Sequence, residues 1–335
     1  MAYDMGDETG LRPGEGSRPL SFEQTVPRSL VHRASLAEVY VADSLQTGDD
    51  EFTLAVQIPR AHCVWFDRHV PYHDPLATAE AARQGVYVIV HRHIGLPAGL
   101  SFSLQRLELS VEDLDGYRDS GSPLQGLLTL RIVRQTRSGG TLGSMTLEGD
   151  IAVDGELLVR VGGDVVFLAS DDFTALRAYQ RRRNPRESAP PPAIGPALDA
   201  PACGRLDRRN SVLGEPSADA GGRFPLIVDQ QHPSFFDHGY DHAPGPLIIE
   251  AYRQAAIVSA HRAGALASPV CAVVGLSAFF KDFAELDSLI EVSAVVDERS
   301  HDGTVRVDVA LQQFDKELST GRVTLRPYAD APLPD

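Results

Sequence analysis

Two apolar stretches with helical spacing are each surrounded by segments in which apolar and polar residues alternate. The spacing predicts helices over residues 75–92 and 244–262, each with a proline in its first turn. The alternating segments have the pattern of half-buried strands. They are 37–41, 52–58, 100–111, 124–137, 145–153 and 156–168 around the first helix, and 224–229, 271–280, 289–298, 305–314 and 322–326 around the second. This order predicts α+β units in which an antiparallel sheet wraps one helix.

The two predicted helices carry the same motif. Glu80 opens the block E-A-A-R-Q, Glu250 opens E-A-Y-R-Q, and a Phe-Asp pair precedes each Glu by the same interval. A His-Arg pair follows each block, again at one spacing, at His91 and His261. Such agreement without a gap indicates a tandem duplication. Two similar units in one chain can face each other like a fused homodimer, which predicts a shared sheet with sites at the seam between the halves.

Composition divides the chain into four segments. A chain of 335 residues favours about two domains of ~150 residues, each large enough for its own core. Residues 1–20 are rich in Gly, Asp and Pro and predict a disordered arm. The Pro/Ala-rich stretch 181–205 is typical of a semi-rigid linker. We therefore expect one folded domain over 21–180 and a second over 206–328.

Charge and composition exclude several classes of partner. The formal net charge of −15 at pH 7 argues against binding to nucleic acid or to an anionic membrane surface. No apolar run reaches the ~18 residues of a membrane span, and the polar, acidic start of the chain is unlike a signal peptide. The three cysteines form no CxxC pair, which favours a reducing compartment. We therefore expect a soluble cytoplasmic protein.

Ionisable side chains crowd the turn before the second predicted helix. They are His232, Asp237, His238, Asp241 and His242. Glu250 and Arg253 follow one helical turn apart inside the apolar segment. A histidine or a partly buried glutamate suits proton transfer near neutral pH, so acids and bases at the mouth of a buried helix predict acid/base chemistry there.

The combined motifs resemble the A-factor synthase (AfsA-like) family. The resemblance rests on V-H-R-A-S at 31–35, on H-D-P-L at 73–76, and on the residues from H-P through F-D-H and D-H-A-P-G to the second E-A-x-R-Q block at 232–254. It covers about residues 25–328. The P-G-x-L-[IL]-x-E part is also shared by hot-dog acyl-carrier-protein dehydratases. Gly239, Ala243 and Pro246 differ from the residues expected at these positions in the family, and these differences bear on which acyl chain the protein prefers. The resemblance implies a tandem (double) hot-dog fold.

The resemblance also implies an acyltransferase of the 2-oxo-3-(phosphooxy)propyl 3-oxoalkanoate synthase type. In this reaction a β-ketoacyl group leaves the thiol of an acyl carrier protein for a hydroxyl of dihydroxyacetone phosphate. Intramolecular condensation with loss of water then gives a butenolide phosphate, a precursor of γ-butyrolactone, butenolide or furan signals. The expected partners are the loaded carrier protein and dihydroxyacetone phosphate, with no cofactor. The protein is expected as a monomer, which is an internal pseudo-dimer, or as a homodimer.

These steps assign candidate roles to residues of both halves. Acid/base candidates are Glu250, His238, His242 and Glu80, with Asp237 orienting His238. Backbone N–H groups near Gly245 and Leu247 can stabilise the thioester oxyanion, and Arg253 and Arg83 can bind the phosphate. The substrate-binding candidates are Arg253, Arg83, Gly245, Leu247, His32 and Arg33. The first half lacks the dense histidine cluster, so we expect the leading acid/base set to be Glu250, His238 and Asp237.

Structural roles remain open for the same residues. Glu250 and Arg253 can form an internal ion pair, as can Glu80 and Arg83. His238 and His242 have the i, i+4 spacing of metal ligands on a helix, but Gly239 and the following Ala-Pro-Gly disfavour a helix there, so we expect no metal.

Three functions of different classes are compatible with the sequence. They are the acyltransferase and cyclase, a hot-dog dehydratase or thioesterase, and a non-catalytic double hot dog that binds an acyl chain in regulation. Arginines next to the glutamate in both helices favour the first over the second, because a plain acyl thioester needs no phosphate clamp.

Overall fold

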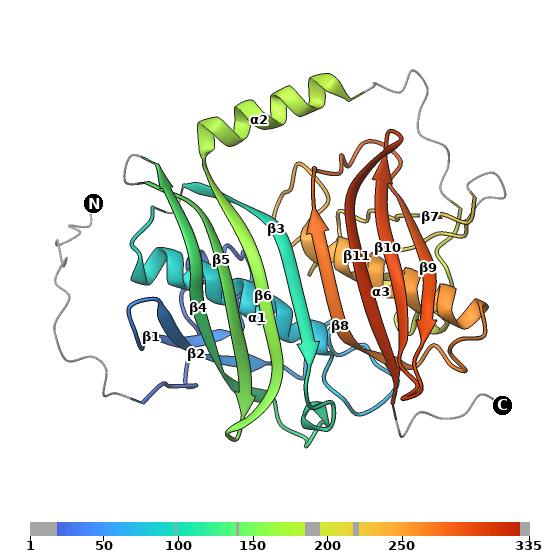
Figure 1. Ribbon diagram of the computed structural model, residues 1–335, viewed down its shortest axis with the longest axis horizontal. Helices are drawn as coiled ribbons and strands as arrows, with labels where there is room; N and C mark the ends of the chain where they lie inside the picture. The colour runs from blue at the N-terminus through green and yellow to red at the C-terminus, as the bar shows by residue number, and fades with distance from the viewer. Residues whose placement is uncertain (1–18, 98, 139–140, 185–194, 217–220, 329–335) are drawn as a thin grey trace.

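One antiparallel sheet runs through both halves of the protein (Figure 1). The computed structural model describes residues 19–97, 99–138, 141–184, 195–216 and 221–328. Residues 1–18 of the expected arm and 185–194 of the expected linker therefore lie outside the described residues. Within the described part of the chain the sheet has 11 strands in the order β1-β2-β4-β5-β6-β3-β8-β11-β10-β9-β7.

Each half is a sheet wrapped around one long helix. The first half contains β1 (Val41–Gln46), β2 (Glu51–Ile58), α1 (Pro75–Val88), β3 (Leu100–Val111), β4 (Leu124–Ser138), β5 (Thr141–Val153), β6 (Glu156–Ala169) and α2 (Ser170–Arg183). The second half contains β7 (Phe224–Pro225), α3 (Gly245–Arg262), β8 (Cys271–Phe280), β9 (Glu291–Arg299), β10 (Val305–Gln313) and β11 (Lys316–Pro327). The predicted α+β class and the double hot-dog architecture are confirmed.

Strands β3 and β8 form the seam between the halves. They pair antiparallel from Arg106 opposite Phe279 to Ser110 opposite Gly275. Figure 1 shows α1 behind the strands of the first half and α3 behind those of the second. The shared sheet predicted from the duplication is thereby confirmed.

Helix α1 is apolar on nearly every side because the sheet wraps around it. Asp74 caps it by accepting a hydrogen bond from the Leu76 N–H (3.0 Å), and Pro75 opens the first turn. Of its 14 residues, all but Arg83 and Tyr87 are buried. The predicted helix over 75–92 is confirmed, although its last turn is a π-helix, Ile89–His93. The two half-exposed side chains of α1 both point to one place, the cleft described below.

Two predicted strands differ from the structure. Residues 37–41 were expected to be a strand, but Leu36–Glu38 is a 3-10 turn, capped by the Ser35 side chain accepting from the Ala37 N–H, and β1 starts only at Val41. The expected strand 224–229 is the two-residue β7, because β9 pairs with only Phe224 and Pro225.

Helix α2 was not predicted from the sequence. Its residues are mostly polar, and Arg177 is its only buried residue. Its position is set by tertiary contacts rather than by an apolar stripe: it crosses from the end of β6 toward the second half (Figure 1). The predicted linker 181–205 therefore begins inside a helix and ends at the buried residue Arg205. No helix among the described residues is long and apolar enough to cross a membrane.

Candidate active site

The duplicated motif builds a carboxylate and two arginines in each half. Glu80 accepts hydrogen bonds from Arg33 Nη2 at 2.6 Å and from Arg83 Nε at 2.8 Å. Glu250 accepts from Arg205 Nη2 at 2.6 Å and from Arg253 Nη2 at 2.8 Å. A glutamine one turn further along each helix, Gln84 or Gln254, also donates to its glutamate. We call these groups the Glu80 cluster and the Glu250 cluster.

Both glutamates are ionised. Burial alone would raise the pKa of Glu80, but Arg33 and Arg83 outweigh it and hold that pKa well below its usual range. Burial opposes the shift at Glu250 as well, where Arg205 and Arg253 lower the pKa to about 2. A carboxylate of this kind has no proton to donate at neutral pH and is a weak base.

A loop from the opposite half completes each cluster. Asp237 of the second half accepts from Arg33 Nη1 at 3.2 Å and from the Ala34 N–H at 2.9 Å. Asp67 of the first half accepts from the Leu206 N–H at 2.7 Å, and its own carbonyl accepts from Arg205 Nη1 at 3.0 Å. The Phe-Asp pairs found in the sequence therefore act across the seam, each on the cluster of the other half.

The two clusters differ in access. A cleft of about 800 Å³ lies beside the Glu80 cluster, between β3, β6, α2 and the segment 238–246. Arg83, Tyr87, His32, His238 and Tyr240 all line it. Glu250 is 0% exposed and Arg205 only 1%, and the cavity that touches Arg205 and Arg253 measures about 30 Å³. Of these two cavities in the described part of the chain, the one beside the Glu80 cluster is large enough for a substrate-sized molecule and the one at the Glu250 cluster is not.

Asp237 and His238 form a dyad at the wall of the cleft. His238 Nδ1 lies 2.5 Å from Asp237 Oδ1, and the carboxylate is 1% exposed whereas the imidazole is 36% exposed. With the Nδ1 proton held by Asp237, the lone pair is on Nε2. The ring also packs against Tyr240, with centroids 4.2 Å apart. Burial raises the pKa of Tyr240 to about 12, so its hydroxyl keeps its proton at neutral pH.

His32 lines the same cleft and is held by aromatic rings and by another histidine. It stacks on Tyr87 with centroids 4.7 Å apart, and its Nε2 lies 2.7 Å from His91 Nε2. His91 Nδ1 is 2.9 Å from the Leu96 carbonyl, which fixes the His91 tautomer and leaves its Nε2 to accept from His32. Burial, then His91 and Arg83, lowers the pKa of His32 to about 4. His32 is therefore neutral at pH 7. Its backbone is in the left-handed region, with φ 54°.

The start of α3 forms part of the cleft. Gly245 lines the cleft, whereas Leu247 is 1% exposed and its N–H donates to the Pro244 carbonyl at 3.0 Å. His242 lines the cleft too, with its Nδ1 2.5 Å from Asp241 Oδ1. Of the two predicted oxyanion donors, only Gly245 is therefore placed toward the cleft.

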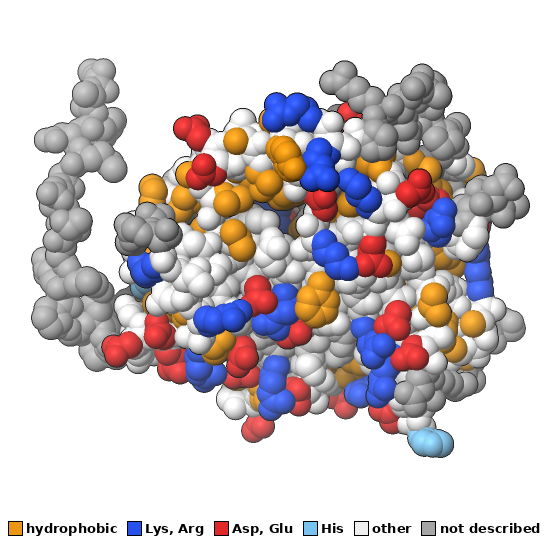
Figure 2. All heavy atoms as spheres, turned by 45° about the horizontal axis from the view of Figure 1, so that its top comes forward, with side chains coloured by type: hydrophobic (Ala, Val, Ile, Leu, Met, Phe, Trp, Pro, Cys, Tyr) orange, Lys and Arg blue, Asp and Glu red, His pale blue; other side chains and the backbone are white. Residues whose placement is uncertain are grey.

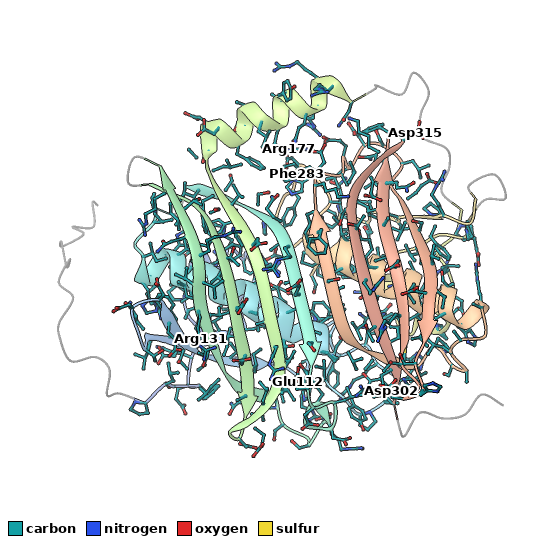
Figure 3. All side chains as sticks on the ribbon, in the orientation of Figure 1. Glu112, Arg131, Arg177, Phe283, Asp302 and Asp315 are labelled. Atoms are coloured by element: carbon teal, nitrogen blue, oxygen red, sulfur yellow. The ribbon has the colours of Figure 1, made fainter. Side chains whose placement is uncertain are left out.

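Helix α2 roofs the cleft and is tied to the second half through Arg177. The guanidinium donates to Asp241 Oδ2 at 2.9 Å and to Glu285 Oε2 at 2.9 Å, and stacks over the Phe283 ring. Figure 3 shows Arg177 and Phe283 beneath α2, between the two halves. The last turn of α2 carries Arg181–Arg183, and Figure 2 shows basic side chains gathered on this face.

The structure regroups the residues singled out in the sequence. Asp237 and His238 come together with Glu80, Arg83, Arg33 and His32 rather than with Glu250. Glu250 and Arg253 lie in the closed cluster with Arg205, which the sequence did not single out. Its signal is present, however: C-G-R-L at 203–206 occupies in the second half the place of V-H-R-A at 31–34. Tyr87 and Tyr240 were also missed. Among the described residues, no group of three His, Cys, Asp or Glu is placed to hold a metal ion.

Known proteins similar to this chain agree on one family. Residues 15–168 and 196–329 match the family described as the A-factor biosynthesis hotdog domain, AfsA. A 2-oxo-3-(phosphooxy)propyl 3-oxoalkanoate synthase of Streptomyces virginiae is 34% identical over 234 residues, which are 69% of this chain and 76% of that protein. A protein of the same name from Streptomyces coelicolor is 31% identical and covers 82% of this chain and 84% of its own length.

One solved structure resembles this chain in the overall path of its backbone. The crystal structure of a putative oleoyl thioesterase from Lactobacillus plantarum is 12% identical, with a TM-score of 0.48, over 86% of this chain and 99% of that chain.

Proposed function

The chain belongs to the A-factor biosynthesis hotdog family, and from this premise we propose that it is an acyltransferase that joins a β-ketoacyl chain to dihydroxyacetone phosphate. The product would be a 2-oxo-3-(phosphooxy)propyl 3-oxoalkanoate, the compound after which the similar Streptomyces synthases are named. One observation carries the proposal: a single cleft joins an Asp-His dyad, an arginine and an apolar wall. The acyl donor is a thioester on an acyl carrier protein.

His238 is the general base. Its Nε2 takes the proton from the substrate hydroxyl, and the oxygen attacks the thioester carbonyl carbon. As the C–O ester bond forms and the C–S bond breaks, the proton passes from His238 to the departing sulfur. Asp237 is a positioning residue, because it holds the imidazole in the tautomer that leaves Nε2 unprotonated.

Two groups are placed to stabilise the oxyanion of the tetrahedral intermediate. The Tyr240 ring lies beside His238, and its hydroxyl keeps its proton at neutral pH. Gly245 opens α3 at the cleft, where the helix dipole favours negative charge. Donors already fixed in the free protein need no reorganisation during the reaction, which is why such groups lower the barrier.

Arg83 is the phosphate contact. Its side chain is 19% exposed toward the cleft, and Glu80 holds it in one orientation through two hydrogen bonds of 2.8 Å. Burial would lower the pKa of Arg83, but Glu80 outweighs it, so the guanidinium stays charged. Arg253 is 6% exposed and faces Glu250, so we assign it to the structure of the closed cluster.

The two glutamates then have positioning roles. Glu80 orients Arg33 and Arg83 at the cleft, and Glu250 joins Arg205 to α3 in the interior. A dehydratase or thioesterase of the kind left open by the sequence would use a helix glutamate as its acid or base. Here each glutamate is kept in its ionised form by two arginines. This observation favours the transferase.

Ring closure would follow in the same cleft. The carbon between the two carbonyls of the β-ketoester loses a proton and attacks the ketone carbon of the dihydroxyacetone unit. A C–C bond forms and water leaves, which gives a butenolide phosphate. His238, which is neutral again after the transfer, is the base for this step.

Mass spectrometry of a reconstituted reaction tests the proposal. Purified protein is incubated with a 3-oxoacyl carrier protein and dihydroxyacetone phosphate, alongside His238→Ala and the surface control His301→Ala. We expect the ester or its butenolide phosphate only when both substrates are present, and a loss of about 10²–10⁴-fold in rate for His238→Ala alone.

Other products would point to other functions. Free acid formed without the phosphate would replace the transferase by a thioesterase. An enoyl thioester formed from a separately supplied 3-hydroxyacyl carrier protein would replace it by a dehydratase. Acyl binding without any conversion would indicate a regulatory binding protein. An unchanged rate in His238→Ala would remove the dyad from the mechanism.

A further inference from the structure

We propose that the acyl chain of the substrate lies in an apolar pocket between α1 and the sheet of the first half, and that Ala82 is the residue that opens this pocket. The inference rests on the proposed function only in taking the chain to be part of a thioester substrate. It adds to that function where the chain is bound and which residues set its length.

The pocket is a side chamber of the cleft. It measures about 50 Å³ and shares Arg83, Tyr87, Phe102 and Leu104 with the cleft wall. Beyond these shared residues its side chains are apolar. They are Ala82, Val86, Leu107, Leu130, Leu147, Val161 and Val165. The pocket thus adjoins the cleft at Arg83, beside the proposed reaction centre, and its remaining wall belongs mostly to the hydrophobic core.

The second half shows what happens when the residue at this helix position is large. The two halves match at an offset of 170 residues (250 − 80), which places Ala82 opposite Tyr252. Tyr252 is 0% exposed, and its hydroxyl donates to Ser319 Oγ of β11 at 2.7 Å. Its ring is so close to Gly321 that a Cβ added there would lie 3.3 Å from Tyr252 Cε2. The tyrosine therefore fills the space between helix and sheet that Ala82 leaves open in the first half.

An apolar chain suits this pocket better than water does. A buried water needs two to four polar partners, and the walls beyond Arg83 and Tyr87 offer only apolar side chains. One water occupies roughly 10–15 Å³ by the same measure, so the pocket holds about three to five methylene-sized groups. Each methylene transferred from water to such a site should strengthen binding about fourfold until the pocket is full.

The shared wall orients the chain. Tyr87 and Phe102 meet edge to face with centroids 4.6 Å apart, and both line the cleft as well as the pocket. A chain that passes these two rings leaves its thioester end in the cleft with His238 and Tyr240. Leu130 and Leu147 line the pocket but not the cleft and are each 2% exposed, so they would limit the length of the chain.

A binding series tests the inference without requiring turnover. The probes are 3-oxoacyl pantetheine analogues of increasing chain length in which CH₂ replaces the thioester sulfur. Their dissociation constants are measured by calorimetry for the wild type, Ala82→Tyr and the control Ala178→Tyr, which adds the same side chain at an exposed position of α2. Wild type and control should gain about fourfold per methylene up to a limit. Ala82→Tyr should gain nothing from added methylenes.

A second variant approaches the pocket from its far end. Leu147→Ala enlarges it, so the chain length at which affinity stops rising should increase by two or three methylenes. This variant decides the question if Ala82→Tyr does not fold. The inference is overturned if wild-type affinity does not depend on chain length, or if folded Ala82→Tyr keeps the wild-type dependence. Chain-length-dependent binding in a protein that makes no ester would support the pocket and reject the proposed function.

Discussion

One arginine from outside the helix decides the state of each helix glutamate. Arg33 and Arg205 approach Glu80 and Glu250 to 2.6 Å and add to the arginine already present one turn along the helix. A buried pair with one cation would still carry the desolvation cost of the carboxylate, and the second cation ensures that it stays ionised. The Glu80 and Glu250 clusters therefore have the same charges. They differ in how buried their arginines are and in which partners these arginines would keep if the glutamate were removed.

Glu250→Gln should destabilise the protein more than Glu80→Gln. Without its carboxylate, Glu250→Gln leaves the buried Arg205 and Arg253 with only Asp74, whose Oδ2 lies 3.5 Å from Arg205 Nη1, which should lower the free energy of unfolding by about 3–5 kcal/mol. Arg33 keeps Asp237 as a partner and Arg83 is partly exposed, so Glu80→Gln should cost about 1–3 kcal/mol. Denaturant unfolding measures both, and equal losses would contradict the difference between the clusters.

His32 should make stability depend on acid pH. Its pKa is about 4 in the folded protein against 6.5 when unfolded, so the unfolded chain binds the proton first. The stabilisation is complete above pH 6.5 and decreases as the pH falls toward 4. Arg83 faces the ring, and its positive charge acts in the same direction as burial; His91 and His238 also face the ring and act in that direction when they are protonated.

The variant His32→Gln isolates this contribution. Burial also lowers the pKa of His73 and His232, which remain in the variant, so the comparison is between wild type and variant at each pH. From pH 7.5 to 5.0 the wild type should lose about 1 kcal/mol more than the variant, after allowance for solvent screening of a partly exposed ring. Parallel pH profiles of unfolding free energy would rule the effect out.

At the level of the helices, α2 is held to the second half mainly by charge, with one aromatic contact, Phe173 against Phe283, beside the ion pairs. Arg177 is 4% exposed and contacts Asp241 before α3 and Glu285 after β8. Arg181 and Asn184 also donate to Glu285. The roof of the cleft thus depends on one buried guanidinium between two carboxylates of the other half.

Arg177→Ala should loosen α2 and weaken substrate binding. We expect the opening free energy of the amides of Ser170–Arg183 to decrease by about 1–3 kcal/mol in hydrogen exchange, and KM to rise more than kcat falls. Arg182→Ala, at an exposed position in the last turn of the same helix, is the control and should change neither. Unchanged exchange in Arg177→Ala would mean that α2 is held by other contacts.

At the scale of the molecule, the halves are interdependent. The seam pairs five residues of β3 with five of β8, and each Glu cluster takes a residue from the opposite loop. A separated half would expose an unpaired strand edge and the buried charges of one cluster. We therefore expect the duplication to unfold as one cooperative unit rather than as two independent domains.

Coexpression of residues 1–189 and 190–335 as two chains tests this interdependence. We expect the fragments to copurify as a 1:1 complex that unfolds in one transition, and each fragment expressed alone to be insoluble or unfolded. Native mass spectrometry measures the stoichiometry. Two separately stable, monomeric fragments would show that the seam and the exchanged aspartates contribute little.

Local sequence patterns predict most of the helices and strands, and the repeated motif predicts the duplication. Strands such as 100–111 and 271–280 are recognisable because side chains alternate between two faces, and the helices because sheet on every side demands an apolar surface all round. The repeated Phe-Asp and E-A-x-R-Q spacing likewise identified both carboxylate clusters and their own-helix arginines. These are properties of short stretches, so periodicity and spacing contain them.

Contacts between residues far apart in the chain are evident only from the tertiary structure. Asp237 is 13 residues from Glu250 in the chain yet contacts Arg33, because the loops cross the seam of the fused halves. Access depends on pairs such as Ala82 and Tyr252, whose difference matters only once a sheet covers them. Helix α2 has no apolar periodicity, since its one buried anchor is an arginine with partners 64 and 108 residues away. Contacts and cavities of this kind arise from packing between distant segments, which local pattern does not encode.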